Sequence, residues 1–448
     1  MSLIKKVAGK VGIDGAIGFT LLARIVQAGG GLITLALIAI FLSKEQQGYY
    51  YTFGSIVAVQ VFFELGLNGI ITQYVAHEIV HLQWESRTKL SGSEVFLSRL
   101  ASILHFCIKI FGVISIILFV ILTISGFVFF TKYQKSTEIV QWKLPWILLS
   151  FSTSLMLTIN PVLAFLEGLG KVKEVAKIRL LQQSANIFCI ALVFILHGSL
   201  FALGMGSFIS FLILSGSIFF TYRKTLLLFI YQSEGKSKVD YWKEIFPYQW
   251  KIALSWVSGY FIFQLFNPVL FATEGAVVAG KMGMTLQALN GISSLSMSWI
   301  NTKIPLMSSL VAEKKFKKLD AVFNKTIIQL SGISFILISF FIIAVIDLNY
   351  FKIVVGQRFL PLLPLVLLCM VTFVNQFVFS WATYLRCHKQ EPFLINSIVM
   401  GIMCGLSTLL LGKSFGLMGI VLGYFSITIF IGLPWSYNLF KSKKLEWH

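Results

Sequence analysis

The chain has 448 residues, of which 57% are hydrophobic and only 12% are charged, and its net charge is +19. A soluble domain carries about a quarter charged residues, so this composition excludes an ordinary soluble enzyme. The loops between the apolar stretches are short, and an integral membrane protein is the class that remains.

Apolar segments follow one another along the whole chain. Each holds the roughly 20 residues that an α-helix needs to cross about 30 Å of hydrocarbon. The segments are 15–42, 48–76, 101–130, 144–168, 174–197, 200–222, 247–272, 276–302, 323–346, 359–385, 392–412 and 415–440. We therefore predict an all-α membrane protein with 12 transmembrane helices.

The segments divide into two groups of six. An even number of spans gives the second group the same orientation as the first, which is typical of transporters built from parallel repeats. We predict a six-helix lobe over 1–222, a cytoplasmic linker over 223–246 and a second six-helix lobe over 247–448.

Matching turns in the two halves indicate an internal duplication. FLSKEQQG at 41–48 and FATEGAVVAG at 271–280 are tight turns with one acidic residue, and each leads into a glycine-containing helix. EGLGKVKEVAKIRLLQQ at 167–183 and YLRCHKQEPFLINSIVMG at 384–401 also join corresponding segments. The offset is about 220–230 residues throughout, which predicts a parallel 6+6 repeat.

Most lysines and arginines fall in the loops of one predicted face. The positive-inside rule places that face, together with both termini, in the cytoplasm. The scattered charges form no module that could fill a nucleic-acid groove, so nucleic acid is not an expected partner. Anionic membrane lipids are expected partners. In one cytoplasmic loop, 303–322 has the pattern of an amphipathic interfacial helix, with 88–101 as its counterpart.

Ionisable residues at membrane depth each cost at least about 2.5–3.5 kcal/mol and usually face a cavity or a partner. The candidates for a substrate cavity are Arg24, Glu64, Lys109, Lys281, Arg179 and Lys251. Arg24 lies 17 residues before Phe41, and Glu64 lies 16 residues after Gly48. Measured along their helices, both therefore lie about 25 Å from the same side of the membrane. A salt bridge between them is expected at this shared depth. For Lys251, Arg179, Lys109 and Lys281 the alternative is a side chain that extends to the headgroups.

Uncharged polar residues and prolines add further candidates. Gln27, Asn68, Gln264 and Asn375 are predicted to line a polar cavity, with hydrogen bonding between helices as the alternative. Pro161 and Pro268 interrupt the fourth and seventh segments. They are predicted hinges or gates, with passive kinks as the alternative.

Two stretches carry a family resemblance. GYYYTFGSIVAVQVFFELGLNGIITQYVAHE at 48–78 resembles the second span of polysaccharide flippases, as does the pattern N…FLEGLGKVKEVAKI from Asn160 to Ile178. The chain resembles, over essentially its whole length, the O-antigen flippase (Wzx-like) branch of the multidrug/oligosaccharidyl-lipid/polysaccharide exporter superfamily.

That resemblance implies a V-shaped pair of six-helix bundles in the bacterial inner membrane. It implies that an undecaprenyl-pyrophosphate-linked oligosaccharide moves from the cytoplasmic to the periplasmic leaflet by alternating access, with glycan assembly proteins such as the polymerase as partners. Similar flippases have a cationic cavity, which Arg24 on the first span matches, and an arginine binds phosphate oxygens well. No Walker motif is present, so H⁺, Na⁺ or the membrane potential is the expected energy source.

Three other functions remain open. A cation-coupled multidrug exporter would need acidic cavity residues, and Glu64 is the clearly deep carboxylate. A membrane glycan polymerase needs a sizeable outer loop, whereas 131–143 is short. His77 to His81 is an H-E-x-x-H sequence, as in zinc proteases, but no third ligand follows it in a fitting place. We therefore expect a transporter rather than an enzyme, with no catalytic residue, cofactor or metal.

Overall fold

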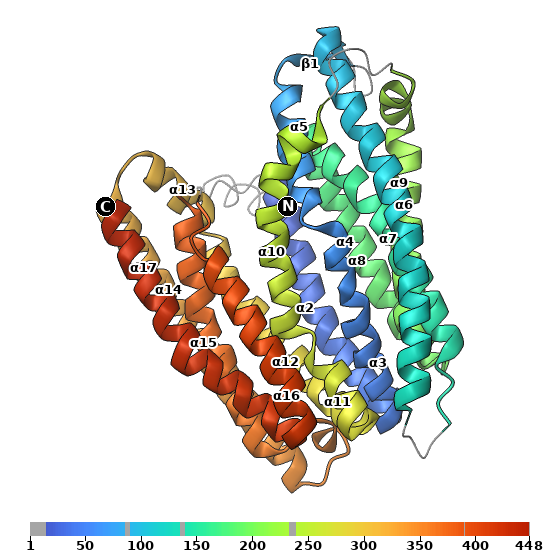
Figure 1. Cartoon of the computed structure of the whole chain (residues 1–448), viewed down its shortest axis with the longest axis vertical. Coiled ribbons are helices and arrows are strands. Elements are labelled where there is room, and N and C mark those ends of the chain that lie inside the picture. Colours follow the sequence, from blue (N-terminus) through green and yellow to red (C-terminus); the bar gives the residue numbers. More distant parts are fainter. Residues whose placement is uncertain (1–14, 86–89, 135–138, 233–238, 389, 448) are drawn as a thin grey trace, which may run out of the picture. The chain divides into compact units, whose positions relative to one another are not determined.

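The computed structural model describes residues 15–85, 90–134, 139–232, 239–388 and 390–447. The first half of the chain forms α2 (Gly15–Phe41), α3 (Lys44–Val57), η1 (Ala58–Gln60), α4 (Val61–Glu64), α5 (Leu67–Ile79), β1 (Leu82–Trp84), β2 (Leu90–Gly92), α6 (Glu94–Tyr133), α7 (Lys143–Gly168), α8 (Val172–Ile195) and α9 (Phe201–Tyr231). Figure 1 shows that long helices make up most of these elements.

The second half of the chain is also almost entirely helical. It forms η2 (Tyr241–Ile245), α10 (Phe246–Phe263), α11 (Phe266–Glu274), α12 (Ala276–Asn301), α13 (Ile304–Ala312), α14 (Phe316–Tyr350), η3 (Gly356–Arg358), α15 (Leu362–Arg386), α16 (Leu394–Ser426), η4 (Ile427–Gly432) and α17 (Leu433–Trp447). Across the described residues, nine helical stretches are long and apolar enough to cross a membrane. The prediction of an all-α, multi-pass membrane protein is confirmed.

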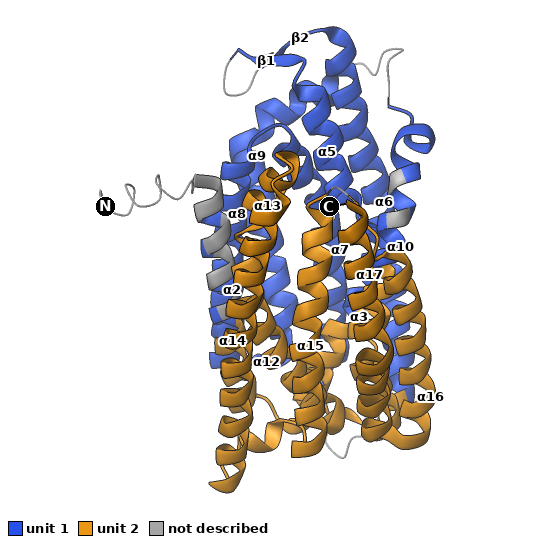
Figure 2. Ribbon diagram, turned by 90° about the vertical axis from the view of Figure 1, so that its left-hand side faces the viewer, with its two compact units in different colours: residues 1–30, 57–132, 141–256 blue, residues 31–56, 133–140, 257–448 orange. Residues whose placement is uncertain are grey.

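The contacts divide the chain into two compact units, which Figure 2 colours separately. Unit 1 contains residues 1–30, 57–132 and 141–256, and unit 2 contains residues 31–56, 133–140 and 257–448. The units are defined by contacts and the predicted lobes by chain order. They differ in the assignment of 31–56, 133–140 and 247–256, and the predicted linker 223–246 belongs to unit 1. The division into 1–222, 223–246 and 247–448 stays a prediction.

In unit 1, α7 is the central helix and packs against α5, α8 and α9. Its Trp146 is fully buried, lies against Gly126 of α6, and donates a hydrogen bond from Nε1 to the carbonyl of Leu122 at 3.0 Å. Gly204 of α9 lies close to the backbone of α7, and its carbonyl accepts a hydrogen bond from Ser152. Small residues thus let the helices approach closely, as is common in membrane proteins.

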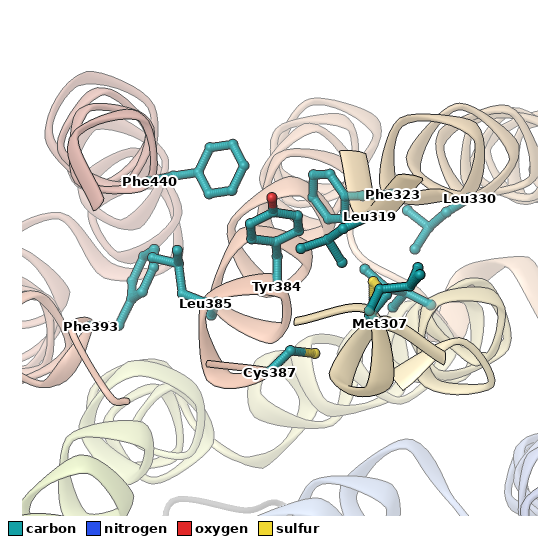
Figure 3. Close-up of a cluster of buried hydrophobic side chains, with 12 residues drawn as sticks. Met307, Leu319, Phe323, Leu330, Tyr384, Leu385, Cys387, Phe393 and Phe440 are labelled. Carbon is teal, nitrogen blue, oxygen red and sulfur yellow. The ribbon is translucent and has the colours of Figure 1, made fainter. Parts of the chain in front are cut away.

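Unit 2 contains a large aromatic core at one end of α14, α15 and α17, where Figure 3 shows Tyr384 between Phe323 and Phe440. The ring centroids lie 4.7 Å apart for Phe323 and Tyr384 and 5.3 Å apart for Tyr384 and Phe440. The buried hydroxyl of Tyr384 donates to Asp320 at 2.7 Å, and Asp320 also pairs with Lys444. A buried tyrosine that keeps a polar partner in this way fixes how the helix ends pack.

The long helix α16 turns back on itself at Gly416, whose φ of 56° and ψ of −137° are not helical. Gly412 packs against Ile420, and Gly423 packs against Ser407, so the two arms of α16 run antiparallel. The Glu274 carboxylate accepts a hydrogen bond from the amide of Leu417 at the turn. The predicted segment 392–412 therefore corresponds to the first arm of α16, and 415–440 corresponds to its second arm continued by η4 and the start of α17.

Two loop predictions differ from the structure. Residues 88–101 were expected to match an amphipathic helix, but 90–92 form β2, which pairs antiparallel with β1, and 94–101 extend α6. The expected interfacial helix over 303–322 is shorter, because α13 ends at Ala312 and α14 begins at Phe316. Lys314 between them has a positive φ of 55°, which a helix does not accommodate.

Candidate functional site

The second predicted segment is broken near its middle, where α4 ends and α5 begins. Leu65 and Gly66 are both in the left-handed region, with φ of 46° and 70°. A Cβ on Gly66 would overlap the side chain of Ile252, and its positive φ favours glycine at this turn. Broken helices at membrane depth are tolerated where the exposed backbone lies in protein or beside a cavity, and in transporters they often lie next to substrate.

Glu64 is the last residue before this break and lies in a polar cluster. Its carboxylate accepts a hydrogen bond from Asn68 at 3.4 Å and another from the side chain of Asn160 on α7. Thr72 on α5 donates to the carbonyl of Ala164 on α7 at 3.0 Å. The predicted residues Glu64 and Asn68 are thus brought together next to Asn160 and Pro161, and amides hold the deep carboxylate.

The ion pair expected between Arg24 and Glu64 stays a prediction. Arg24 lies on α2, but its side chain lies outside the described residues, as does that of Lys251 on α10. Gln27 is described and exposed. The polar cluster around Glu64 is therefore described on the side of α5 and α7 only.

Other predicted cavity residues lie elsewhere in the two units. Arg179 pairs with Glu167 at 3.2 Å and is 46% exposed. Lys109 is exposed on α6, on the same helix face as the exposed Val113 and Ile116. The apolar surroundings of Lys109 are those expected for a side chain that reaches toward the headgroups.

Four predicted residues belong to unit 2, and three of them, Asn375, Gln264 and Pro268, lie in separate places. Asn375 donates to the hydroxyl of Tyr424 at 3.0 Å and lines a small cavity of about 60 Å³. Gln264 lies at the junction between α10 and α11, and Pro268 is buried in the first turn of α11. Helix α10 thus stops just before Pro268, whereas Pro161 lies inside the continuous helix α7. The hinge roles of both prolines stay predictions.

A second polar cluster lies at the end of unit 1 where α5, α6 and η2 meet. It surrounds a cavity of about 480 Å³ lined by Gln73, Tyr74, His77, Glu78, Arg99 and Glu244, among others. Arg99 bridges two carboxylates, with 2.9 Å to Glu78 and 2.7 Å to Glu244, and Tyr74 donates to the carbonyl of Glu244. The sequence suggests only loop charges for Arg99 and Glu244, since neither side chain lies in an apolar stretch.

The H-E-x-x-H residues take part in these contacts. Glu78 is 7% exposed and is held by Arg99, while the ring of His81 stacks on Phe96 at 4.1 Å. In the described part of the chain, no group of three His, Cys, Asp or Glu side chains is arranged to hold a metal ion. Here the glutamate connects α5 to α6 through an ion pair.

The ion pair with Arg99 also controls the protonation of Glu244. Burial raises the pKa of the Glu244 carboxyl, but hydrogen bonds from Arg99 and from the Asp240 amide outweigh burial, and the net pKa is lowered. A carboxyl whose pKa is lowered by folding stabilises the folded state above its unfolded pKa, and this contribution is lost as pH falls through the folded value. Docking of η2 onto α5 and α6 should therefore weaken in acid.

We expect Arg99→Ala to loosen this end of unit 1, because Glu78 and Glu244 would face each other without a cation. Removing one partner from a partly buried network costs about 1–3 kcal/mol. Protease cleavage near 239–245 in the purified protein should become faster at neutral pH. Adding E78Q and E244Q to the Arg99→Ala variant removes the repulsion and should restore part of the resistance to the protease. Equal cleavage of parent and Arg99→Ala would contradict the bridging role.

In unit 2, the two repeat-related turns predicted from 41–48 and 271–280 pack against each other. Gln47 donates to the carbonyl of Gly280 at 2.8 Å, and the amide of Gly48 lies against Gly280. Arg358 of η3 is buried beside them and donates to the carbonyls of Leu42 at 2.6 Å and Ala39 at 3.3 Å. We call the contact made by Gln47, Gly48, Gly280 and Arg358 the glycine seam.

The sequence gives no sign that Arg358 is a structural residue, since it looks like one of the few basic residues on the face opposite the cytoplasm. Its role depends on tertiary contacts, because it caps the carboxyl end of α2 from more than 300 positions away in the chain. A cation at a helix C-terminus interacts favourably with the helix dipole. Burial lowers the pKa of the Arg358 guanidinium from its ordinary value. The ordinary pKa of an arginine is so high that the group still keeps its charge.

The comparisons with known proteins place this architecture. No family model matches the chain. No curated protein sequence matches it either. Among solved structures, an inward-facing multidrug resistance MATE family transporter of the MOP superfamily covers 92% of this chain and 98% of its own length, with 14% identity and a TM-score of 0.55.

Two further structures show the same fold. The lipid II flippase MurJ, in an inward closed conformation, covers 96% of this chain and 90% of its own length, with 13% identity and a TM-score of 0.57. An outward-facing MATE family transporter of the MOP superfamily covers 96% of both chains, with 14% identity and a TM-score of 0.51. The chain therefore has the fold of the membrane transporters of this superfamily.

Proposed function

We propose that the chain is a flippase that moves an undecaprenyl-pyrophosphate-linked oligosaccharide, such as an O-antigen repeat unit, from the cytoplasmic to the periplasmic leaflet. It would act by alternating access in the bacterial inner membrane, with both termini in the cytoplasm. H⁺, Na⁺ or the membrane potential would drive the cycle without covalent chemistry. Anionic lipids and other glycan assembly proteins, such as the polymerase, are its proposed partners.

The observation that carries the proposal is the pairing of two carboxylates of unit 1 with arginines. Arg99 holds Glu78 and Arg179 holds Glu167, while Glu64 accepts a hydrogen bond from Asn68. A paired carboxylate offers less attraction to a cationic drug, whereas an anionic pyrophosphate is stabilised by cations that are available to bind it. In this proposal Arg24 meets the pyrophosphate, and Lys109 and Lys281 are weaker candidates.

The second candidate function is a cation-coupled multidrug exporter, since two of the structures with this fold are named multidrug resistance transporters. It would use Glu64 as the residue that binds H⁺ or a cation at the broken helix. The fold alone does not separate the two functions, because the lipid II flippase MurJ shares it. The charge of the transported molecule separates them.

We expect Arg24→Ala to abolish surface glycan in a strain that depends on this gene. The reason is that a pyrophosphate in a low-dielectric cavity needs a permanent positive partner. The Arg24→Lys variant keeps the charge without the planar fork and should retain part of the activity. Surface glycan and the amount of membrane-inserted protein should be measured together. Normal glycan at a normal protein level in Arg24→Ala would remove Arg24 from the mechanism.

A further inference from the structure

A cavity of about 520 Å³ lies in unit 2 beside the end of α14 and is separate from the polar cluster around Glu64. Two lysines line it, Lys44 from the start of α3 and Lys281 from the second turn of α12. Lys44 Nζ donates to Gln357 at 2.9 Å, and Gln357 also lines the cavity. The described lining contains no carboxylate, so the cavity is positively charged.

Apart from Asn349, the remaining side chains that line this cavity are apolar. Ile346 of α14 and Leu362 of α15 line it, together with Phe359, Leu360 and Pro361 from the loop before α15. Ile346 is 44% exposed and Leu362 is 52% exposed, so both present apolar surface to the surroundings. The walls therefore suit a hydrocarbon chain better than a small hydrated ion.

The apolar surface continues beyond the cavity along the chain. Tyr350, Phe351, Ile353 and Val354 at the end of α14 are all largely exposed. Exposed aromatic and aliphatic residues beside lysines are typical of the level where lipid headgroups meet the hydrocarbon. The charge distribution of the sequence predicts that this level belongs to the outer leaflet.

We propose that this cavity binds the phosphate headgroup of an anionic membrane lipid, with its first chain carbons against Ile346 and Leu362. Lys44 and Lys281 supply the charge, and Gln357 supplies an amide donor. A free phosphate would leave the apolar walls in water, and a cationic drug would meet two like charges. Lys281, a weaker candidate for the transported pyrophosphate, is assigned here to the lipid headgroup, and this assignment holds whichever substrate the protein transports.

The test uses the full chain in nanodiscs that contain phosphatidylglycerol with a photoreactive diazirine in its acyl chain. Mass spectrometry then maps the labelled peptides. The segment 345–362 should be labelled, and the double variant K44Q/K281Q should reduce this labelling roughly thirtyfold, since each of the two lysines near a lipid headgroup contributes about 1 kcal/mol. The matched variant K132Q/K413Q removes two exposed lysines predicted on the same face and should label as the parent does.

Two further arms identify the ligand. Diacylglycerol with the same diazirine has no phosphate and should label 345–362 weakly. The variant Ile346→Trp narrows the apolar wall without changing charge and should also reduce labelling, so the result does not depend on the lysine variant alone. Equal labelling of K44Q/K281Q and the parent, or equal labelling by diacylglycerol, would overturn the site. Full competition by millimolar inorganic phosphate would overturn the assignment to a lipid.

Discussion

Replacing Gly48 by leucine is expected to unfold the glycine seam of unit 2. A Cβ on Gly48 would overlap the carbonyl oxygen of Ala276, and the neighbouring Gly280 lies against the Gly48 backbone. Because the obstacle is main chain, no change of rotamer relieves it, and α3 and α12 must separate. Overpacking of this kind costs typically about 1–3 kcal/mol and more where backbone must move, so a loss at or above about 3 kcal/mol is expected.

The same helix supplies the control for this prediction. Gly54 also lies on α3, but a Cβ there meets no atom within 4 Å. The Gly54→Leu variant should therefore unfold at the parent temperature or slightly higher, since leucine favours helix more than glycine does. The thermal unfolding midpoint in detergent is the measurement. If both variants unfold at the same temperature, the close approach of α3 and α12 is wrong.

Replacing Arg358 by methionine is expected to destabilise unit 2 by about 3 kcal/mol or more, since hydrogen bonds to a charged donor contribute about 1.5–3 kcal/mol each. Methionine keeps an apolar stem but leaves the carbonyls of Ala39 and Leu42 and the side chain of Gln47 without their donor. Arg358 is only 6% exposed, so water does not readily replace the guanidinium. The unfolding midpoint should fall well below that of the parent.

Two further variants distinguish the loss of the buried contacts of Arg358 from the loss of one positive charge. Arg358→Lys keeps the charge but cannot reproduce the planar fork, so its midpoint should lie between those of the parent and Arg358→Met. Lys413→Met removes one charge at an exposed position and should change the midpoint little. Stability of Arg358→Met equal to that of Lys413→Met would show that the buried contacts of Arg358 contribute nothing.

The helices were largely predictable because apolar length has a direct physical cause in the thickness of the bilayer. The predicted segment 144–168 corresponds to α7 at Lys143–Gly168, and 276–302 corresponds to α12 at Ala276–Asn301. The two stretches matched in the sequence, 41–48 and 271–280, also contact each other in the glycine seam. Local pattern was sufficient in these cases.

Contacts between distant residues were not predictable in the same way. Arg99 and Glu244 look like loop charges because their partners come from other segments, and Arg358 looks like an outer-face anchor for the same reason. Glu64 and Asn68 could be found, since polar residues inside an apolar run stand out. Leu65 gave no signal, because a leucine in the left-handed region is imposed by the surrounding fold.

Transport of a lipid-linked pyrophosphate oligosaccharide is tested most directly by reconstitution. Purified protein in liposomes should move a fluorescent polyprenyl-pyrophosphate oligosaccharide between leaflets, measured as sugar that becomes accessible to a membrane-impermeant glycosidase when an ion gradient or potential is applied. Arg24→Ala should stay at the rate of empty liposomes. Movement of a cationic dye down the same gradient, with no movement of the oligosaccharide lipid, would contradict the proposed function and support the multidrug exporter.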